Sequence, residues 1–196
     1  MSRAGFVLVG GRSSRMGADK ALLPFRGSTL CEYVAHRVLE AAGSVTLVGS
    51  PGRYGSLGFP VLDDRLSGRG PLGGIETALG ATGAEWNLMV ACDMPGVTTP
   101  MLGALLEAAE EEASCDCLLP LGVDGRVEPL CAVYRRDCLP ALRRALETGV
   151  HRITDAVSTL RVAYRPAPPA AFLRNLNTPE EWRSFLASEE ALTPHG

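Results

Sequence analysis

Several features that define other protein classes are missing from this sequence. No stretch approaches the roughly 18 apolar residues of a membrane-spanning helix, and the apolar run 4–9 is too short for the core of a secretion signal. Neither sign of charge dominates, since the formal net charge is only -3. We therefore expect a cytoplasmic protein that has no membrane association and no general attraction to nucleic acid.

Residues that carry other kinds of chemistry are also scarce. The six cysteines form no C-x-x-C pair, which is typical of reduced thiols rather than a zinc site, and the apolar flank of Cys115 and Cys117 indicates a buried strand. The three histidines (His36, His151 and His195) lie too far apart along the chain to suggest a zinc cluster or a catalytic triad. The G-x-S-x-G pattern is absent, which counts against hydrolases. Gly10 and Gly11 do not begin a G-x-G-x-x-G pattern, and no Lys-Ser or Lys-Thr follows a glycine as in a Walker A motif, which counts against dehydrogenases and P-loop NTPases.

The order of apolar patterns predicts the fold class. Short apolar runs alternate with amphipathic segments along all 196 residues, so we expect a single domain, 1–196, with a mostly parallel central sheet in a three-layer α/β arrangement. The expected strands are 5–9, 45–48, 61–62, 88–91, 117–121, 129–134 and 161–164. The expected helices are 29–43, one opening at 75–79, 99–112, 138–146, 152–160 and one capped by Thr178.

A loop rich in glycine and cationic residues follows the first expected strand. It contains Gly10 and Gly11, then Arg12, Arg15 and Lys20. Glycines allow backbone N–H groups to approach a ligand closely, and loops at the carboxyl ends of parallel strands are where open α/β sheets bind ligands. The loop is therefore interpreted as an anion-binding loop, and the alternative is an ordinary connection with solvated arginines.

The segment 8–20, Leu-Val-Gly-Gly-Arg-Ser-Ser-Arg-Met-Gly-Ala-Asp-Lys, resembles the signature L-A-G-G-x-S-x-R-M-G-x-D-K of the molybdenum cofactor guanylyltransferases. The resemblance implies a Rossmann-like nucleotidyltransferase fold, in which Leu8, Gly10 and Gly11 line the nucleotide. It also implies that Lys20 contacts the phosphates, assisted by Arg15. Val9 replaces the usual alanine and is expected to crowd the nucleotide pocket without adding a polar conflict.

Further segments match the family in order. The segment 70–75 resembles G-P-L-x-G, which places Gly73 beside the nucleotide, and the preceding Asp64 lies where the family has a nucleotide-contacting aspartate. The segment 91–95 resembles C-D-x-P, which makes Asp93 a nucleotide contact and the expected magnesium ligand. The alternative for both aspartates is a turn at the end of a strand.

Two segments in the second half of the chain also resemble the family, whereas one family residue is missing from the first half. The segment 128–134 resembles the family's H-P or E-P-L strand, where the second substrate is expected to lie, and 175–181 resembles N-x-N-T-P-E-E. Asn177 is a candidate metal ligand, although it also suits a turn before a capped helix. The family's asparagine after the second strand is missing from 48–51, so one nucleotide contact is in doubt.

The resemblance implies a reaction as well as a fold. Residues 1–100 would form the nucleotide-binding half and 101–196 the half for the cofactor substrate. The terminal phosphate of molybdopterin would attack the α-phosphorus of GTP, with Mg²⁺ as cofactor and with Lys20, Arg15 and Asp93 as the catalytic residues. We also expect transient contact with proteins that deliver or accept the molybdenum cofactor.

Three alternatives stay open. A cytidylyltransferase of the same fold would carry L-A-A-G in the first loop, so Gly10 and Gly11 favour guanine. A sugar-phosphate nucleotidyltransferase is more distant, because many of these enzymes add a further domain. A noncatalytic nucleotide-binding protein would retain the loop without turnover, and the presence of Lys20 and Asp93 argues against it.

Overall fold

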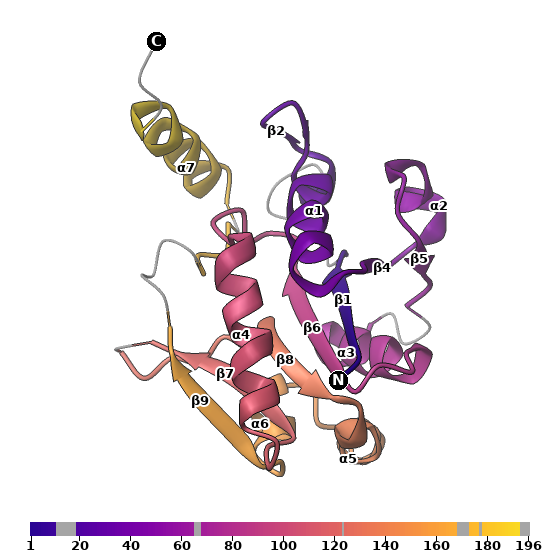
Figure 1. The fold of residues 1–196 in the computed structure, drawn as a ribbon. Coiled ribbons are helices and arrows are strands. Elements are labelled where there is room, and N and C mark those ends of the chain that lie inside the picture. Colours follow the sequence, from indigo (N-terminus) through magenta and orange to yellow (C-terminus); the bar gives the residue numbers. More distant parts are fainter. Residues whose placement is uncertain (11–18, 65–67, 123, 168–172, 177, 193–196) are drawn as a thin grey trace.

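The structure, a computed structural model, is built around one seven-stranded sheet (Figure 1). It describes residues 1–10, 19–64, 68–122, 124–167, 173–176 and 178–192. The sheet order is β5-β4-β1-β6-β8-β7-β9, and only β8 runs antiparallel to its neighbours. Its strands are β1 (Arg3–Leu8), β4 (Thr46–Val48), β5 (Val61–Leu62), β6 (Trp86–Ala91), β7 (Cys117–Leu121), β8 (Cys131–Arg135) and β9 (Val162–Pro166). The predicted α/β fold with a mostly parallel central sheet is confirmed.

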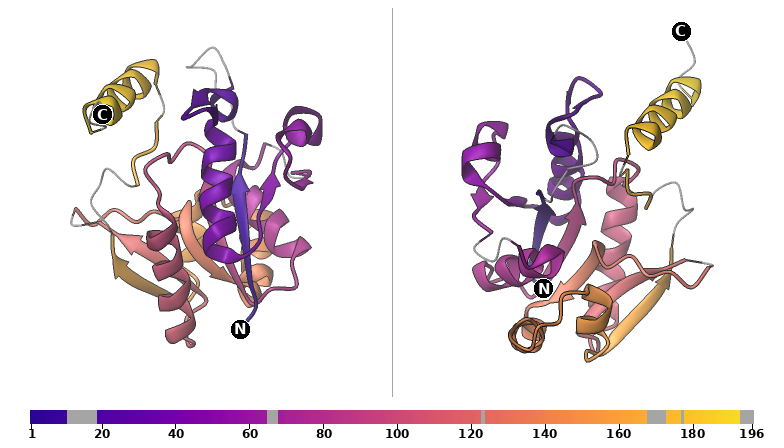
Figure 2. Two further views of the ribbon diagram at one scale, coloured as in Figure 1. Left: turned by 45° about the horizontal axis from the view of Figure 1, so that its top comes forward. Right: turned by 180° about the vertical axis from the view of Figure 1, so that it is seen from behind.

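Helices cover both faces of the sheet, which gives three layers (Figure 2). Alternate residues of a strand point to opposite faces, so Val7 packs with α1 (Leu30–Ala42) and α4 (Thr99–Glu111), whereas Phe6 packs on the other face. The second face is covered by α3 (Gly70–Ala81), α5 (Leu139–Glu147) and α6 (Ile153–Val157). Both faces are apolar because a central parallel strand is buried on both sides.

The predicted helix caps are mostly found in place. Thr29 and Glu32 form the full capping box of α1, and Gly43 ends that helix in the left-handed conformation with φ of 77°. The predicted cap of α4 is wrong by one residue: the Thr98 hydroxyl accepts the Met101 N–H. The neighbouring hydroxyl of Thr99 instead donates to Glu40 at 2.6 Å.

The expected start of α3 is also wrong. The helix begins at Gly70, five residues before Ile75, because Pro71 suits the first helical turn. Gly74 lies inside the helix, and a methyl group there would come within 3.3 Å of a Leu8 side-chain carbon. Gly73 and Gly74 therefore lie inside α3 and do not precede it. The lack of a side chain at Gly74 allows the helix to approach the end of β1.

Some short elements were not expected from the sequence. They are the hairpin of β2 (Pro24–Phe25) and β3 (Ser28–Thr29), the helix α2 (Pro51–Tyr54), and the 3-10 turns η1 (Lys20–Leu22), η2 (Gly55–Leu57) and η3 (Arg136–Cys138). The hairpin has a packing role, because the Phe25 ring lies 5.7 Å from the Trp182 ring and 5.8 Å from the Phe185 ring. These aromatic contacts hold the last helix, α7 (Pro179–Leu192), against the hairpin.

The state of the cysteines agrees with a further expectation. All six cysteines are free and buried, and burial raises the pKa of the Cys31 thiol to about 12, which keeps it protonated. Within the part of the chain that the structure describes, no helix combines the length and apolar character needed to cross a membrane.

Gly5 marks the tightest approach of a helix to the sheet. A methyl group at this position would collide with a Val38 methyl group and would lie 2.6 Å from the Ser44 carbonyl oxygen. We predict that Gly5→Ala lowers the free energy of unfolding by about 1–3 kcal/mol, measured by urea denaturation.

The control for this prediction is Gly103→Ala in α4, where a methyl group meets no atom within 4 Å. That variant should gain up to about 1 kcal/mol through helix propensity. Equal stability of the two variants would show that Gly5 does not limit the approach of α1.

Candidate functional site

The candidate site lies at the carboxyl edge of the two central strands. β1 ends at Leu8 and β6 ends at Ala91, and the parallel register pairs these two residues. Beyond the strands, the Cys92 N–H donates to the Leu8 carbonyl oxygen at 3.1 Å. The chain leading to Gly10 and the chain leading to Asp93 therefore leave the sheet side by side.

Lys20 and Asp93 meet at this edge. The Lys20 Nζ lies 3.3 Å from the Asp93 Oδ2, and the two side chains are only 14% and 21% exposed. Partial burial reduces screening by water, so the charges interact more strongly than a surface pair. Lys20 is also the only lysine in the sequence. Two residues predicted from separate motifs, 73 positions apart, are thus brought into contact.

The end of β1 supplies the other predicted residues of the first loop. Gly10 adopts φ of +130°, a conformation that L side chains rarely adopt, so its glycine is required by the backbone. The Val9 side chain is only 4% exposed and packs into the core on the α1 face of the sheet. Leu8 lies against the first turns of α3, which carry Gly73 and Gly74.

Asp64 lies farther along the same edge. It follows β5, which is two strands from β1 in the sheet order and so about 10 Å away. The Thr77 hydroxyl of α3 donates to its Oδ1 at 3.4 Å. The structure therefore places Asp64 beside α3 rather than in contact with Lys20 and Asp93.

Three predicted site residues lie outside the described residues: Gly11, Arg15 and Asn177. The segment just before Asn177 does reach the site, because the Leu176 N–H donates to the Asp93 carbonyl oxygen at 3.1 Å. Next to it, the Asn175 side-chain oxygen is buried and has no hydrogen-bond partner among the described residues. A buried amide oxygen in this state is suited to accept a ligand.

Glu128 is a further residue of the candidate site. The sequence analysis predicted the strand around it but did not select Glu128 itself. The register of β6 and β8 pairs Val90 with Cys131, and the Ala91 N–H donates to the Leu130 carbonyl oxygen at 2.8 Å. Glu128 precedes β8, where its N–H donates to the Pro120 carbonyl oxygen of β7 at 3.1 Å, so it lies at the edge where β6 and β7 end. Burial raises the pKa of the Glu128 carboxyl, and the charges of Asp124 and Asp93 add to that rise against the opposing charge of Arg126.

Asp19 and Tyr54 complete the set of residues that were not selected from the sequence. Asp19 precedes the turn that carries Lys20, and the Tyr54 hydroxyl donates to its Oδ2 at 2.8 Å. Asp19 could have been chosen because it lies inside the first motif. Tyr54 carries no such signal, since α2 was not expected.

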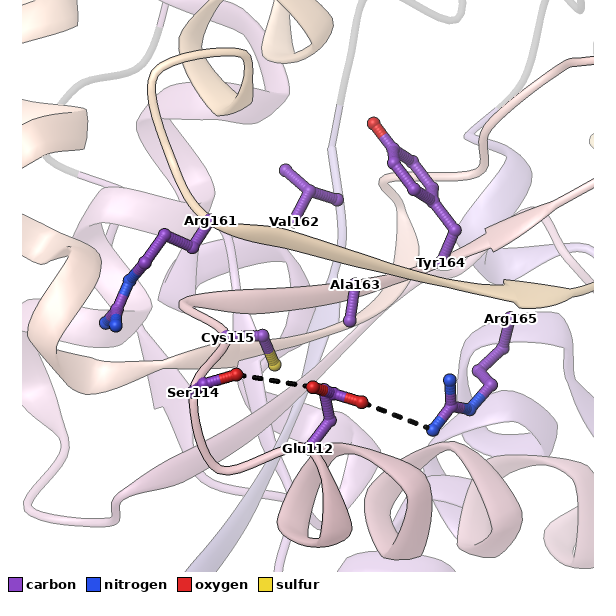
Figure 3. A pocket seen from close by; sticks show the side chains of 8 residues that line it. All are labelled: Glu112, Ser114, Cys115, Arg161, Val162, Ala163, Tyr164 and Arg165. Atoms are coloured by element: carbon purple, nitrogen blue, oxygen red, sulfur yellow. Dashed lines mark hydrogen bonds and ion pairs between the residues drawn. The ribbon is translucent and has the colours of Figure 1, made fainter.

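A separate hollow of about 500 Å³ lies at the far edge of the sheet, against β9 (Figure 3). Arg165 there pairs with Glu112 at 3.8 Å, and the Ser114 hydroxyl donates to the same carboxylate at 3.2 Å. The hollow is lined by residues just before β7 and along nearly all of β9. It does not include Lys20 or Asp93, so the geometry of the carboxyl edge is the better guide to chemistry.

Comparisons with known proteins show which family this chain resembles. The family model of the MobA-like NTP transferase domain matches residues 5–162. A relative from Carboxydothermus hydrogenoformans, named "probable molybdenum cofactor guanylyltransferase", is 33% identical, covering 92% of this chain and 93% of its own length. A relative of the same name from Nostoc is 34% identical, covering 96% and 93%.

A solved structure is also similar over the whole fold. It is the molybdopterin-guanine dinucleotide biosynthesis protein A of Archaeoglobus fulgidus, with a TM-score of 0.81 and 26% identity. The alignment covers 96% of this chain and all of that chain.

The raised pKa of Glu128 generates a prediction about stability. Above its folded-state pKa this carboxylate is charged in surroundings less favourable than water, and the cost disappears as pH falls toward the unfolded value of about 4.3. We predict that Glu128→Gln is more stable than the wild type at pH 7 and that the difference vanishes near pH 4, measured by urea denaturation. Glu147→Gln, at an exposed position, serves as the control. A Glu128→Gln advantage that is equal at both pH values would contradict the assignment.

Proposed function

We propose that this chain, which belongs to the MobA-like NTP transferase domain family, transfers GMP from GTP to a molybdopterin-type molybdenum cofactor and releases pyrophosphate. The observation that carries the proposal is the contact between Lys20 and Asp93 at the edge where β1 and β6 end. These two residues belong to motifs that are separate in the sequence. The substrates are proposed from the names of relatives at 33% and 34% identity. The chain would then act in the cytoplasm, where its six free thiols stay reduced.

The described residues fit a magnesium ion. Mg²⁺ takes oxygen ligands and is usually held by one or two carboxylates together with substrate phosphates. Asp93 offers a carboxylate, and the buried amide oxygen of Asn175, which has no hydrogen-bond partner among the described residues, offers a second, neutral oxygen ligand. Asn177 is the other candidate ligand. When bound here, magnesium would neutralise charge on the triphosphate.

The chain's own groups would position and neutralise the reactants. A terminal phosphate oxygen of the acceptor forms a bond to the α-phosphorus of GTP, and the bond from that phosphorus to the bridging oxygen breaks, so pyrophosphate leaves. Because the nucleophile is already an anion, no side chain has to remove a proton from it. The work of the site is then to hold the groups in line and to offset developing charge, which suits the Lys20 ammonium group, with Arg15 as its partner.

The remaining predicted residues would contact the triphosphate and the nucleoside of GTP. Gly10 and Gly11 would allow close approach of the triphosphate, and Leu8, Val9 and Gly73 would border the nucleoside. Asp64 lies beside α3, and a carboxylate can accept both N–H groups of the guanine edge. Proteins that deliver the molybdenum cofactor or accept its dinucleotide form would meet the chain transiently.

The test is pyrophosphate release by the purified protein with molybdopterin, magnesium, and GTP or CTP in parallel. We predict release that is selective for GTP and that Asp93→Ala reduces by about 100-fold or more. Asp137→Ala removes a carboxylate that is 76% exposed and should leave the rate unchanged. Selectivity for CTP would overturn the base assignment. Binding of GTP without any turnover would favour a noncatalytic nucleotide-binding protein.

A further inference from the structure

Asp19 joins two parts of the molecule through its two carboxylate oxygens. Its Oδ1 accepts the N–H of Ala21 at 3.1 Å, which caps the 3-10 turn η1. Its Oδ2 accepts the Tyr54 hydroxyl at 2.8 Å, with the Arg53 guanidinium at 3.8 Å. The residue between Asp19 and Ala21 is Lys20, so the capped turn is the segment from which the lysine side chain departs.

Tyr54 is a rigid support for this carboxylate. Its side chain is 1% exposed, at the end of the short helix α2, and its ring edge lies 3.1 Å from where a methyl group at Gly49 would stand. Gly49 follows β4 and donates its N–H to Leu62 of β5 at 2.9 Å, so the tyrosine ring rests on the sheet itself. Burial raises the pKa of the Tyr54 phenol, and its hydrogen bond to Asp19 adds to that rise, so the hydroxyl remains a donor at neutral pH.

Backbone hydrogen bonds fix the conformation of this short turn. The Leu22 N–H donates to the Asp19 carbonyl oxygen and the Leu23 N–H to the Lys20 carbonyl oxygen, each at 3.1 Å. A lysine side chain has several rotatable bonds, and holding it in one direction costs conformational entropy. Fixing the backbone at its root removes part of that freedom before the Lys20 Nζ reaches Asp93 at 3.3 Å.

We propose that Tyr54 is a positioning residue for Lys20, acting through Asp19. The hydroxyl fixes the carboxylate, the carboxylate caps the turn, and the turn directs the ammonium group to the site edge. Only the effect of this role on turnover depends on the proposed function. Tyr54 comes from the segment after β4, in which the asparagine expected from the family resemblance is missing, so a residue without a counterpart in the motifs takes part in building the site.

The first test is a double-mutant cycle on turnover. Tyr54→Phe removes the hydroxyl and keeps the ring, and it should lower kcat about tenfold while changing KM for GTP less than about twofold, because a misplaced charge mainly affects the transition state. In the Lys20→Met background the same change should have no further effect. A loss of equal size in both backgrounds would overturn the proposal, because a general structural defect does not depend on Lys20. Tyr164→Phe, at a tyrosine 49% exposed on β9, is the matched control.

The second test needs no turnover. Because Lys20 is the only lysine, protein labelled with ε-¹³C-lysine gives a single side-chain NMR signal from it. We expect Tyr54→Phe and Asp19→Asn each to shift this signal, and Tyr164→Phe to leave it in place. A signal unmoved by Tyr54→Phe would overturn the link to Lys20. If the wild type shows no turnover, the proposed function fails while this measurement still decides the positioning role.

Discussion

The parallel pairing of β1 with β6 is the constraint on which the candidate site depends. Six consecutive residue pairs align the two strands, and the ladder continues past their ends through the hydrogen bond between Cys92 and Leu8. Because both strands run the same way, the loop that follows each leaves from the same edge. A cation from the segment after β1 and a carboxylate from the segment after β6 can then meet at this edge.

The ion pair at this edge also explains how two opposite charges can be accommodated there. A charged side chain that is partly buried alone loses part of its interaction with water. Each charge offsets this loss for the other, with 14% and 21% of the side chains exposed. The proposed reactants carry charges of the same two kinds, phosphate for Lys20 and metal for Asp93, so the site can exchange one set of partners for another.

Sequence patterns predicted the fold and the centre of the site but not its supports. The strands that reach the core were found because apolar runs such as 88–91 are buried on both faces, and caps such as Thr29 with Glu32 have a local cause. Lys20 and Asp93 were found because each lies in a recognisable motif. Tyr54 could not be found, since its role depends on a contact across 35 positions with no periodic pattern around it. The start of α3 was misplaced because glycines that normally end elements here serve close packing against Leu8.

The reversed direction of β8 has a consequence for how acceptor recognition can vary. Since β8 alone is antiparallel, its amino end lies at the edge where the other strands have their carboxyl ends, and Glu128 enters the site from the start of a strand. The connection before it runs from Leu121 to Val127, and these two residues form an antiparallel bridge. Changes in its length or composition would therefore alter what faces the acceptor while leaving the β1 and β6 pairing intact. Under the proposed function, the fold would thus separate the part that handles the nucleotide from a part that can be exchanged to suit a different second substrate.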